Sequence, residues 1–356
     1  MKSGLEDIVA AETMLSDVDG ANGRLVIRGR GLGDLAGRWR FEQVVRLLLE
    51  GLVDELPDAE HLPAMLGTAR AEVFDRVGPL LPALGQRPVY DAMRAGVALL
   101  PDGVTVEDAL RLIAAPAVLL PALIRQEKGE APLAPDAALG HAVDVVRMLG
   151  GAPEAADALD TYLVTVCDHG LNASTFAARV VASTQAGLTS AVLAGLSALK
   201  GPLHGGAPGP VITMLDAIAA DGDPARWLAA EIGSGRRLMG FGHRIYRTRD
   251  PRADALKAAV KGLPRTAGRL AFAERVEQAA LDALHDAKPD RALQTNVEFY
   301  TALLLEAVGF PAEAFTGVFA MGRVAGWIAH AREQALTGRL IRPQSIYVGP
   351  KTGLAA

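Results

Sequence analysis

Cysteine, excess positive charge and long apolar runs are all scarce in this 356-residue chain. The single cysteine, Cys167, excludes an internal disulfide and a cysteine-rich metal motif. The net charge of -5 argues against a general nucleic-acid or anionic-membrane surface, because both need a basic excess. The apolar stretch 114–124 is too short to span a bilayer, and residues 1–20 show no secretory signal. We therefore expect a soluble cytoplasmic protein that holds any anionic ligand in a local cluster of charge.

Helical periodicity is what the chain has in abundance. Before it, short apolar runs flank the turn dipeptides Asp19-Gly20 and Asn22-Gly23, which predicts a small N-terminal β-hairpin. From residue 41 apolar residues recur at helical spacing, and similar patterns predict helices at 106–114, 138–149, 155–167, 174–184, 188–199, 211–220, 224–232, 252–262, 269–287, 297–308 and 314–336. The predicted fold class is all-α, and the length favours one large domain plus a smaller lobe.

Four glycine- and proline-rich segments interrupt the predicted helices, at 201–210, 233–252, 288–296 and 338–350. Binding and catalytic groups concentrate in loops that a rigid scaffold positions. Two of the seven histidines, His204 and His243, lie inside such segments. These two histidines are therefore the first candidates for a functional site.

His204 lies in the sequence Gly-Pro-Leu-His-Gly-Gly, residues 201–206, just before a predicted helix. Glycine lets the backbone approach a ligand closely. A neutral imidazole near a helix N-terminus can polarise a carbonyl group, because the helix dipole disfavours the charged form and leaves an N–H to donate. The alternative is a histidine that caps the helix or is hydrogen-bonded within the core.

Positive charge gathers around His243. Residues 236–252 contain six arginines and one acid, Asp250, in a chain that is acidic overall. Arginine stays charged and grips carboxylates and phosphates with two parallel hydrogen bonds, so the segment predicts an anion site. A solvated basic face is one alternative, and a surface that binds a phosphorylated polymer with steep salt dependence is another. Arg323 and Arg342 form a second basic pair near the C-terminus.

Two further polar residues are ambiguous when taken alone. Glu298 opens a predicted helix after a loop, where an acid usually complements the helix dipole. His169 directly follows Cys167 and Asp168 and precedes another predicted helix. Adjacent residues rarely converge on one ion and no partner motif is present, so no metal site is expected.

Together these segments resemble the citrate synthase family over nearly the whole chain. The region around Ser-Asp-Val-Asp-Gly, from residue 16, resembles the family's opening hairpin. The other matching motifs are His-Gly-Leu-Asn-Ala-Ser-Thr-Phe from residue 169, Gly-Pro-Leu-His-Gly-Gly-Ala from 201, Gly-Phe-Gly-His-Arg-Ile-Tyr-Arg from 240, Asp-Pro-Arg from 250, Asn-Val-Glu-Phe-Tyr from 296 and Arg-Val-Ala-Gly-Trp-Ile-Ala-His from 323. Because they follow the family's order and rough spacing, a chance match is very improbable.

The resemblance implies a two-domain, almost entirely helical subunit that works as a homodimer. The large domain would comprise residues 1–206 and 312–356, and the small domain, residues 207–311, would close over a bound 2-oxo acid. The implied reaction condenses acetyl-CoA with oxaloacetate and water to give citrate and CoA, through enolisation of the thioester. No permanently bound cofactor or metal is implied, and neither nucleic acid nor a membrane is an expected partner.

The resemblance also implies roles for individual residues. His204 would polarise the thioester carbonyl, His243 would protonate the ketone oxygen, and Glu298 would remove the methyl proton. The oxaloacetate site would be formed by His169, Arg252, Arg323 and Phe319, with Arg342 reaching in from the partner subunit. Arg247 would face the phosphates of coenzyme A.

Two positions depart from the family's common pattern. The base is usually aspartate, and Glu298 is longer by one methylene, which displaces the carboxylate if the backbone is unchanged. A displacement on the order of 1 Å can cost about a hundredfold in rate. Pro208 stands where asparagine is more common. A branch of the family described as a second citrate synthase resembles this chain at both positions, which favours compensation over inactivity. The open alternatives are a 2-methylcitrate synthase using propionyl-CoA and a weakly active or non-catalytic homologue that binds acyl-CoA or oxo acid.

Overall fold

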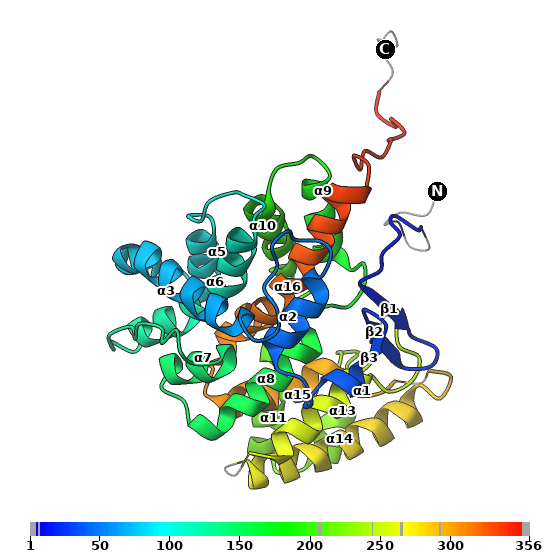
Figure 1. Cartoon of the computed structure of the whole chain (residues 1–356). Coiled ribbons are helices and arrows are strands. Elements are labelled where there is room, and N and C mark those ends of the chain that lie inside the picture. Colours follow the sequence, from blue (N-terminus) through cyan, green and yellow to red (C-terminus); the bar gives the residue numbers. More distant parts are fainter. Residues whose placement is uncertain are drawn as a thin grey trace.

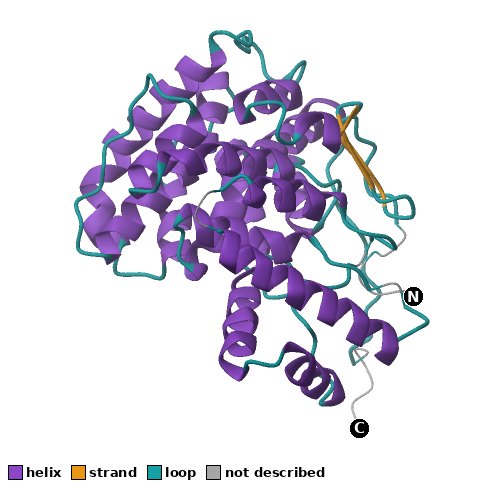
Figure 2. Ribbon diagram, turned by 90° about the horizontal axis from the view of Figure 1, so that it is seen from below, coloured by secondary structure: helices purple, strands orange, loops and turns teal. Residues whose placement is uncertain are grey.

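The computed structural model describes residues 5, 8–205, 208–243, 245–263, 266–291 and 293–350. Helices dominate it, and one small antiparallel sheet lies at the edge of the helical body (Figure 2). The all-α class predicted from the sequence, with its N-terminal hairpin, is confirmed. The side chain of Pro208 lies outside the described part of the chain, as do residues 206 and 207, where the predicted domain boundary falls.

The sheet has the strand order β1 (Ser16–Asp19), β2 (Arg24–Ile27) and β3 (Arg30–Gly31). β1 and β2 form the predicted hairpin, with Ser16 opposite Ile27. Leu25 and Ile27, two positions apart on β2, are both buried, so the pleat fixes the register of the hairpin against the helices. The two-residue strand β3 pairs with β2 and adds a third strand that the sequence pattern does not predict.

Helices follow the sheet along the rest of the chain (Figure 1). Their bounds are α1 (Leu32–Leu35), α2 (Phe41–Leu49), α3 (Leu62–Val77), α4 (Leu81–Leu84), α5 (Val89–Val97), α6 (Val106–Glu127), α7 (His141–Leu149), α8 (Ala156–Val166), α9 (Ala173–Ala182), α10 (Leu188–Leu199), α11 (Pro208–Asp221), α12 (Pro224–Gly233), α13 (Pro251–Lys261), α14 (Ala267–Ala287), α15 (Val297–Val308) and α16 (Phe315–Thr337). Short 3₁₀ turns η1 (Gly78–Leu80), η2 (Pro153–Ala155) and η3 (Ala312–Ala314) precede α4, α8 and α16.

The first half of the chain contains more helix than the sequence predicts. α3 was not predicted, because its buried face includes Arg70, a polar interruption of the apolar pattern that pairs with buried Asp144 at 2.8 Å. α6 was expected to end at residue 114, yet it continues through Pro116 and Pro121 to Glu127. Since nearly all of its side chains beyond residue 108 are buried, packing against neighbouring helices outweighs the hydrogen bonds that the prolines remove.

α16 is the central helix on which several other helices pack. It is buried along most of its length and contacts α6, α8, α9 and α10. A Cβ atom at Gly326 would lie 2.3 Å from the carbonyl oxygen of Cys167, and one at Gly322 would lie 2.6 Å from Val166. These two glycines therefore let α16 press against the end of α8, which places Arg323 beneath the segment that carries His169.

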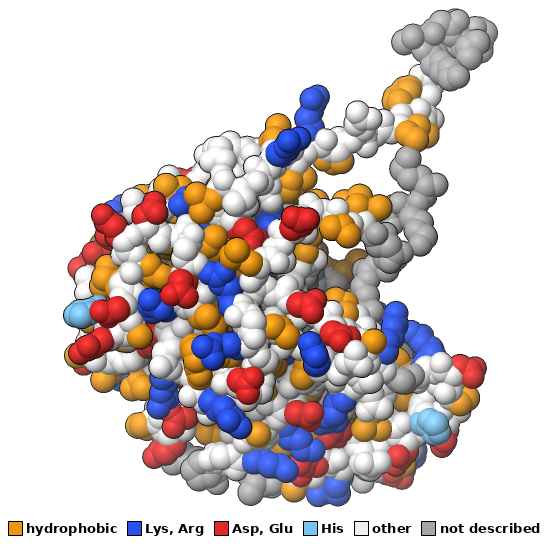
Figure 3. Space-filling model, turned by 45° about the vertical axis from the view of Figure 1, so that its right-hand side comes forward, with side chains coloured by type: hydrophobic (Ala, Val, Ile, Leu, Met, Phe, Trp, Pro, Cys, Tyr) orange, Lys and Arg blue, Asp and Glu red, His pale blue; other side chains and the backbone are white. Residues whose placement is uncertain are grey.

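α11 to α15 form a second group of helices at one side of the body (Figure 1). Within it α13 packs on α15, α12 on α14 and α11 on α15, while α13 and α15 also contact α8 of the first group. Beyond α16, residues 342–350 are exposed and leave the body as an extended tail (Figures 1 and 3). Among the described residues, no helix is both long and apolar enough to cross a membrane.

Candidate active site

His204 lies between α10 and α11, beside the first turn of α9. A Cβ at the next residue, Gly205, would come within 2.3 Å of the Leu199 carbonyl oxygen, so the tight turn here requires glycine. The imidazole Nε2 of His204 lies 2.8 Å from the Ser174 hydroxyl. Burial, together with the charge of Arg323, lowers the pKa of His204 to about 4. The imidazole is therefore neutral at neutral pH.

Ser174 is the hydrogen-bond partner of His204. Its hydroxyl accepts the indole N–H of Trp327 at 3.2 Å and lies 2.8 Å from Asn172 Oδ1. Asn172 caps α9, and this same oxygen already accepts the main-chain N–H groups of Ser174 and Thr175. The serine hydroxyl has one proton, which it donates to Asn172 Oδ1 in this arrangement, and its oxygen can then accept from His204 Nε2.

Backbone hydrogen bonds determine the tautomer of His243. Its Nδ1 accepts the main-chain N–H groups of Ile245 and Tyr246 at 3.0 and 3.1 Å. Burial first, and then the charge of Arg252, lower the pKa of His243 to about 4, so the neutral ring carries its proton on Nε2. Nε2 lies 3.2 Å from Nη2 of Arg252. Two nitrogen donors thus lie next to each other at this point of the site.

Arg252 is held by its own helix cap. Asp250, the N-cap of α13, accepts Nε and Nη2 of Arg252 at 3.0 and 2.8 Å. Both residues are buried, with 1% of Asp250 and 4% of Arg252 exposed. The neighbouring carboxylate raises the pKa of Arg252 against the opposing effect of burial, so the guanidinium is charged and its orientation is fixed.

Arg323 is as deeply buried as Arg252 but is held differently. Its Nε donates to the Val166 carbonyl oxygen at 2.6 Å, and its guanidinium carbon lies 4.7 Å above the ring of Phe319. Within the described part of the chain, no carboxylate lies within ion-pair distance of it. Burial lowers the pKa of Arg323 to about 10, so it remains charged at neutral pH and is a strong site for an anion.

His169 lies between the two arginines and His243. Its Nε2 is 3.1 Å from the Tyr246 hydroxyl, and its ring centre is 5.8 Å from that of His243. Burial lowers the pKa of His169 well below its usual value, and the charges of Arg252 and Arg323 act in the same direction. A third neutral imidazole therefore belongs to the cluster.

Glu298 is in the first turn of α15, which Asn296 caps by accepting the Glu298 N–H at 3.0 Å. The Asn296 amide also donates to the Gly242 carbonyl oxygen at 2.8 Å, which ties the start of α15 to the loop that carries His243. Burial raises the pKa of the Glu298 carboxyl to about 7, although Arg252 opposes the rise. The group is therefore poised to exchange a proton near neutral pH.

Two predicted site residues lie apart from this cluster. Arg247 is exposed, and its main-chain N–H donates to the Gly20 carbonyl oxygen at 2.9 Å, next to the N-terminal hairpin. Arg342 is exposed on the extended tail that follows α16. Any contribution of these two residues requires a long ligand or a second subunit.

Three contributors were not predicted as site residues: Ser174, Trp327 and Asp250. In the sequence, Ser174 and Trp327 stand out only as members of two of the family's motifs. Asp250 carried a signal, since it is the one acid among six arginines at 236–252. In all three cases the role depends on a side chain from another part of the fold.

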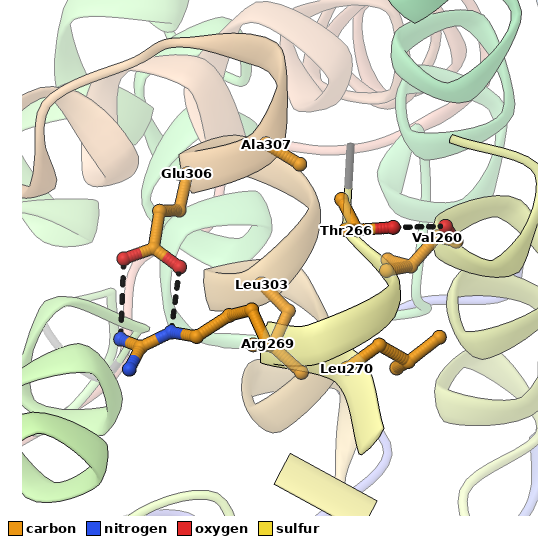
Figure 4. Close-up of a pocket in the computed structure, with 7 residues that line it drawn as sticks. All are labelled: Val260, Thr266, Arg269, Leu270, Leu303, Glu306 and Ala307. Atoms are coloured by element: carbon orange, nitrogen blue, oxygen red, sulfur yellow. Dashed lines mark hydrogen bonds and ion pairs between the residues drawn. The ribbon is translucent and has the colours of Figure 1, made fainter. Parts of the chain in front are cut away.

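A small pocket lies apart from this cluster. It has a volume of about 170 Å³ between α13, α14 and α15, and is lined by Arg269, Glu306 and apolar residues (Figure 4). Arg269 Nε lies 3.0 Å from Glu306, so the charged groups at its rim satisfy one another. It is too small for a coenzyme and does not contact the histidine cluster. Among the described residues, no group of three His, Cys, Asp or Glu is placed to hold a metal ion.

Comparison with known proteins decides the family. The family model described as "Citrate synthase, C-terminal domain" matches residues 4–344. The chain belongs to the citrate synthase family. This confirms the resemblance inferred from the sequence, and with it the assignment as a citrate synthase-type acyltransferase.

Individual relatives extend over almost the whole length. The chain is 38% identical over 358 residues to a Mycobacterium tuberculosis protein named "Putative citrate synthase 2", covering 98% of this chain and 92% of that protein. It is 35% identical to a 2-methylcitrate synthase of the same organism, with coverage of 98% and 91%. The structure of Thermoplasma acidophilum citrate synthase in a ternary complex with carboxymethyl coenzyme A and oxaloacetate has a TM-score of 0.85 and 29% identity, with coverage of 99% and 97%.

Proposed function

We propose that the protein condenses acetyl-CoA with oxaloacetate and water to give citrate and coenzyme A. The observation that carries the proposal is the combination of two neutral imidazoles, His204 and His243, with a buried carboxyl, Glu298, whose pKa is about 7. Such a set suits a reaction in which one group removes a proton from a carbon atom and another group donates a proton to an oxygen atom.

In the first step Glu298 removes a proton from the methyl group of the thioester. This methyl group is a very weak acid, so the negative charge that develops on the thioester oxygen needs a donor that is already in place. His204 is that donor: when the Ser174 hydroxyl turns from Asn172 Oδ1 toward Nε2 of His204, the imidazole carries its proton on Nδ1. Burial raises the pKa of Glu298, which makes it a stronger base than an exposed carboxylate.

In the second step the enolate carbon attacks the ketone carbon of oxaloacetate, which forms the new C–C bond. The ketone oxygen becomes a hydroxyl by taking the proton on Nε2 of His243, the nitrogen next to Arg252 Nη2. Water then cleaves the thioester bond: it returns a proton to Nε2 of His243, and the proton held by Glu298 passes to the leaving sulfur. The products are citrate and the free thiol of coenzyme A.

The two arginines fit the two carboxylates of oxaloacetate. Arg323 is buried and lacks a carboxylate among the described residues, so a substrate carboxylate supplies the missing counter-charge. Arg252 is held at a fixed angle by Asp250 and meets the same substrate from α13. His169 adds a neutral polar contact, and Phe319 forms the floor beneath Arg323.

The remaining parts of the proposal concern assembly and the coenzyme. Residues 207–311 act as a small domain that closes over the oxo acid against residues 1–206 and 312–356. The protein is a homodimer in the cytoplasm, and the exposed tail delivers Arg342 to the site of the partner subunit. Arg247, exposed beside the hairpin, faces the phosphates of coenzyme A.

Thiol release tests this function. Purified protein given acetyl-CoA should release free coenzyme A only when oxaloacetate is also present. If acetyl-, propionyl- and butyryl-CoA all give no oxaloacetate-dependent signal, the proposal is wrong. His204→Ala should lose the signal while remaining folded, and a fully active variant would overturn the role of His204.

A 2-methylcitrate synthase is the second candidate, because one relative at 35% identity carries that name. It needs the same residues with propionyl-CoA in place of acetyl-CoA. Comparison of kcat/KM for the two thioesters separates the candidates. Glu298→Asp tests the third possibility, a weakly active homologue: a large gain in rate would mean that the native base is poorly placed, and a loss would mean that the pocket is adapted to glutamate.

A further inference from the structure

Asp250 makes more contacts than a helix cap needs. Its Oδ1 accepts the main-chain N–H and the Nε of Arg252, each at 3.0 Å. Its Oδ2 accepts Nη2 of Arg252 at 2.8 Å and the main-chain N–H of Val297 at 3.1 Å. Four donors from two helices thus converge on one buried carboxylate.

These contacts join two parts of the site that are far apart in sequence. Arg252 is the arginine that meets the oxo acid, and Val297 is the residue directly before Glu298 on α15. Because α13 and α15 both begin at this carboxylate, a shift of the Arg252 side chain is transmitted to the start of the helix that carries the base. The other link between these loops, from Asn296 to Gly242, does not involve Arg252.

We propose that Asp250 is a positioning residue that couples binding of the oxo acid at Arg252 to the placement of Glu298. The inference rests on the proposed function, since it takes Arg252 as the oxo-acid ligand and Glu298 as the base. Its benefit is protection of the thioester: the base is correctly aligned only when the electrophile is in place.

The charge of Asp250 gives this role a second, measurable consequence. The groups that act on Glu298 are Asp250 and Arg252 at the start of α13, Arg237 in the loop after α12, and Asn296 at the cap of α15. Asp250 raises the pKa of Glu298, whereas Arg252 and Arg237 lower it. Replacing Asp250 by the neutral asparagine removes the one negative charge in this set, so the base ionises at lower pH.

The chain contains a matched control. Asp223 is also an N-cap followed by proline, at the start of α12, where it accepts the main-chain N–H of Arg226 at 3.1 Å. It is exposed and lies outside the site. Asp223→Asn therefore makes the same chemical change at the same kind of cap without touching Arg252 or Val297.

The experiment compares Asp250→Asn and Asp223→Asn in full-length protein. For Asp250→Asn we expect the KM for oxaloacetate to rise at least tenfold, kcat to fall, and the acidic limb of kcat/KM for acetyl-CoA to move to lower pH. Asp223→Asn should match the wild type in all three. If Asp250→Asn behaves like Asp223→Asn, the inference is wrong while the proposed function stands. An inactive wild type would instead defeat the proposed function.

A longer carboxylate covers the possibility that Asp250→Asn does not fold, which circular dichroism would reveal. Asp250→Glu keeps the charge but displaces it by a methylene. We expect its acidic limb to stay at the wild-type position while the KM for oxaloacetate still rises several-fold. A wild-type KM in a folded Asp250→Glu protein would overturn the positioning role.

Discussion

Arg252 and Arg323 are two buried arginines in one site, and they are stabilised in opposite ways. Arg252 shares its charge with Asp250, which holds it through two hydrogen bonds. Arg323 donates to a carbonyl oxygen and lies over an aromatic ring, and no carboxylate in the described part of the chain is within ion-pair distance of it. Accordingly the pKa of Arg252 is raised and that of Arg323 is lowered to about 10.

This difference indicates that the two arginines have different roles in the site. A paired arginine is fixed in direction and adds little net charge, so it suits orientation of a substrate and of neighbouring groups. An unpaired buried guanidinium costs free energy in the absence of an anion, and that cost is offset when a carboxylate arrives. We therefore expect Arg252 mainly to orient the substrate and Arg323 mainly to attract its carboxylate.

The largest expected effect comes from the base on the Arg252 side. Glu298→Gln keeps the size of the side chain but cannot accept a proton, so kcat should fall by about 10² to 10⁴. Oxaloacetate binding, which we propose depends on the arginines, should stay within a few-fold of wild type by calorimetry. A variant that keeps its kcat would show that another group is the base.

The same substitution at the two arginines gives the sharpest contrast. Both Arg252→Met and Arg323→Met should weaken oxaloacetate binding by about 2–5 kcal/mol, because each removes a buried charged contact. Stability should differ: Arg252→Met leaves Asp250 buried without its partner, which costs about 3–5 kcal/mol, whereas Arg323→Met removes a charge that has no partner. Denaturant unfolding measures both. Equal loss of stability in the two variants would contradict the view that only Arg252 neutralises a buried carboxylate.

The pH dependence reports on Glu298. Its pKa is raised to about 7, and the base must be ionised, so activity is present above that pH and is lost as pH falls through it. We expect kcat/KM for acetyl-CoA to fall about tenfold per pH unit on the acidic side. The histidines should not contribute in this range, since the pKa values of His204 and His243 are about 4. In Glu298→Gln this limb should vanish from any residual activity.

The smallest expected effect lies on the Arg323 side, at Ser174. Ser174→Ala removes the hydroxyl that occupies His204 Nε2 and that accepts the Trp327 N–H. Since no hydroxyl is then left to donate to Nε2, kcat should fall by about tenfold, in line with about 1–3 kcal/mol for a lost buried partner. Ser174→Thr keeps the hydroxyl and should recover much of the rate. If the alanine variant matches wild type, Ser174 does not select the tautomer.

Helix boundaries show which parts of the fold can be predicted from local sequence. Caps are local, so the starts of α9, α13 and α15 follow from Asn172, Asp250 and Asn296. The helix α3 could not be recognised as readily, because buried Arg70 interrupts the apolar pattern until its distant partner Asp144 is known. The continuation of α6 through two prolines likewise depends on the helices that surround it.

The sequence by itself determined the helical class, the order of the motifs and the types of residue that perform the chemistry. It did so because periodicity, caps and motif spacing are properties of neighbouring residues. Tertiary structure decided that Arg252 has a carboxylate partner while Arg323 is held by a carbonyl and a ring, that Ser174 meets His204, and that Glu298 is buried beside Arg252. Charge state and tautomer depend on burial and on neighbours from distant segments, and only the folded chain brings those neighbours within a few ångströms.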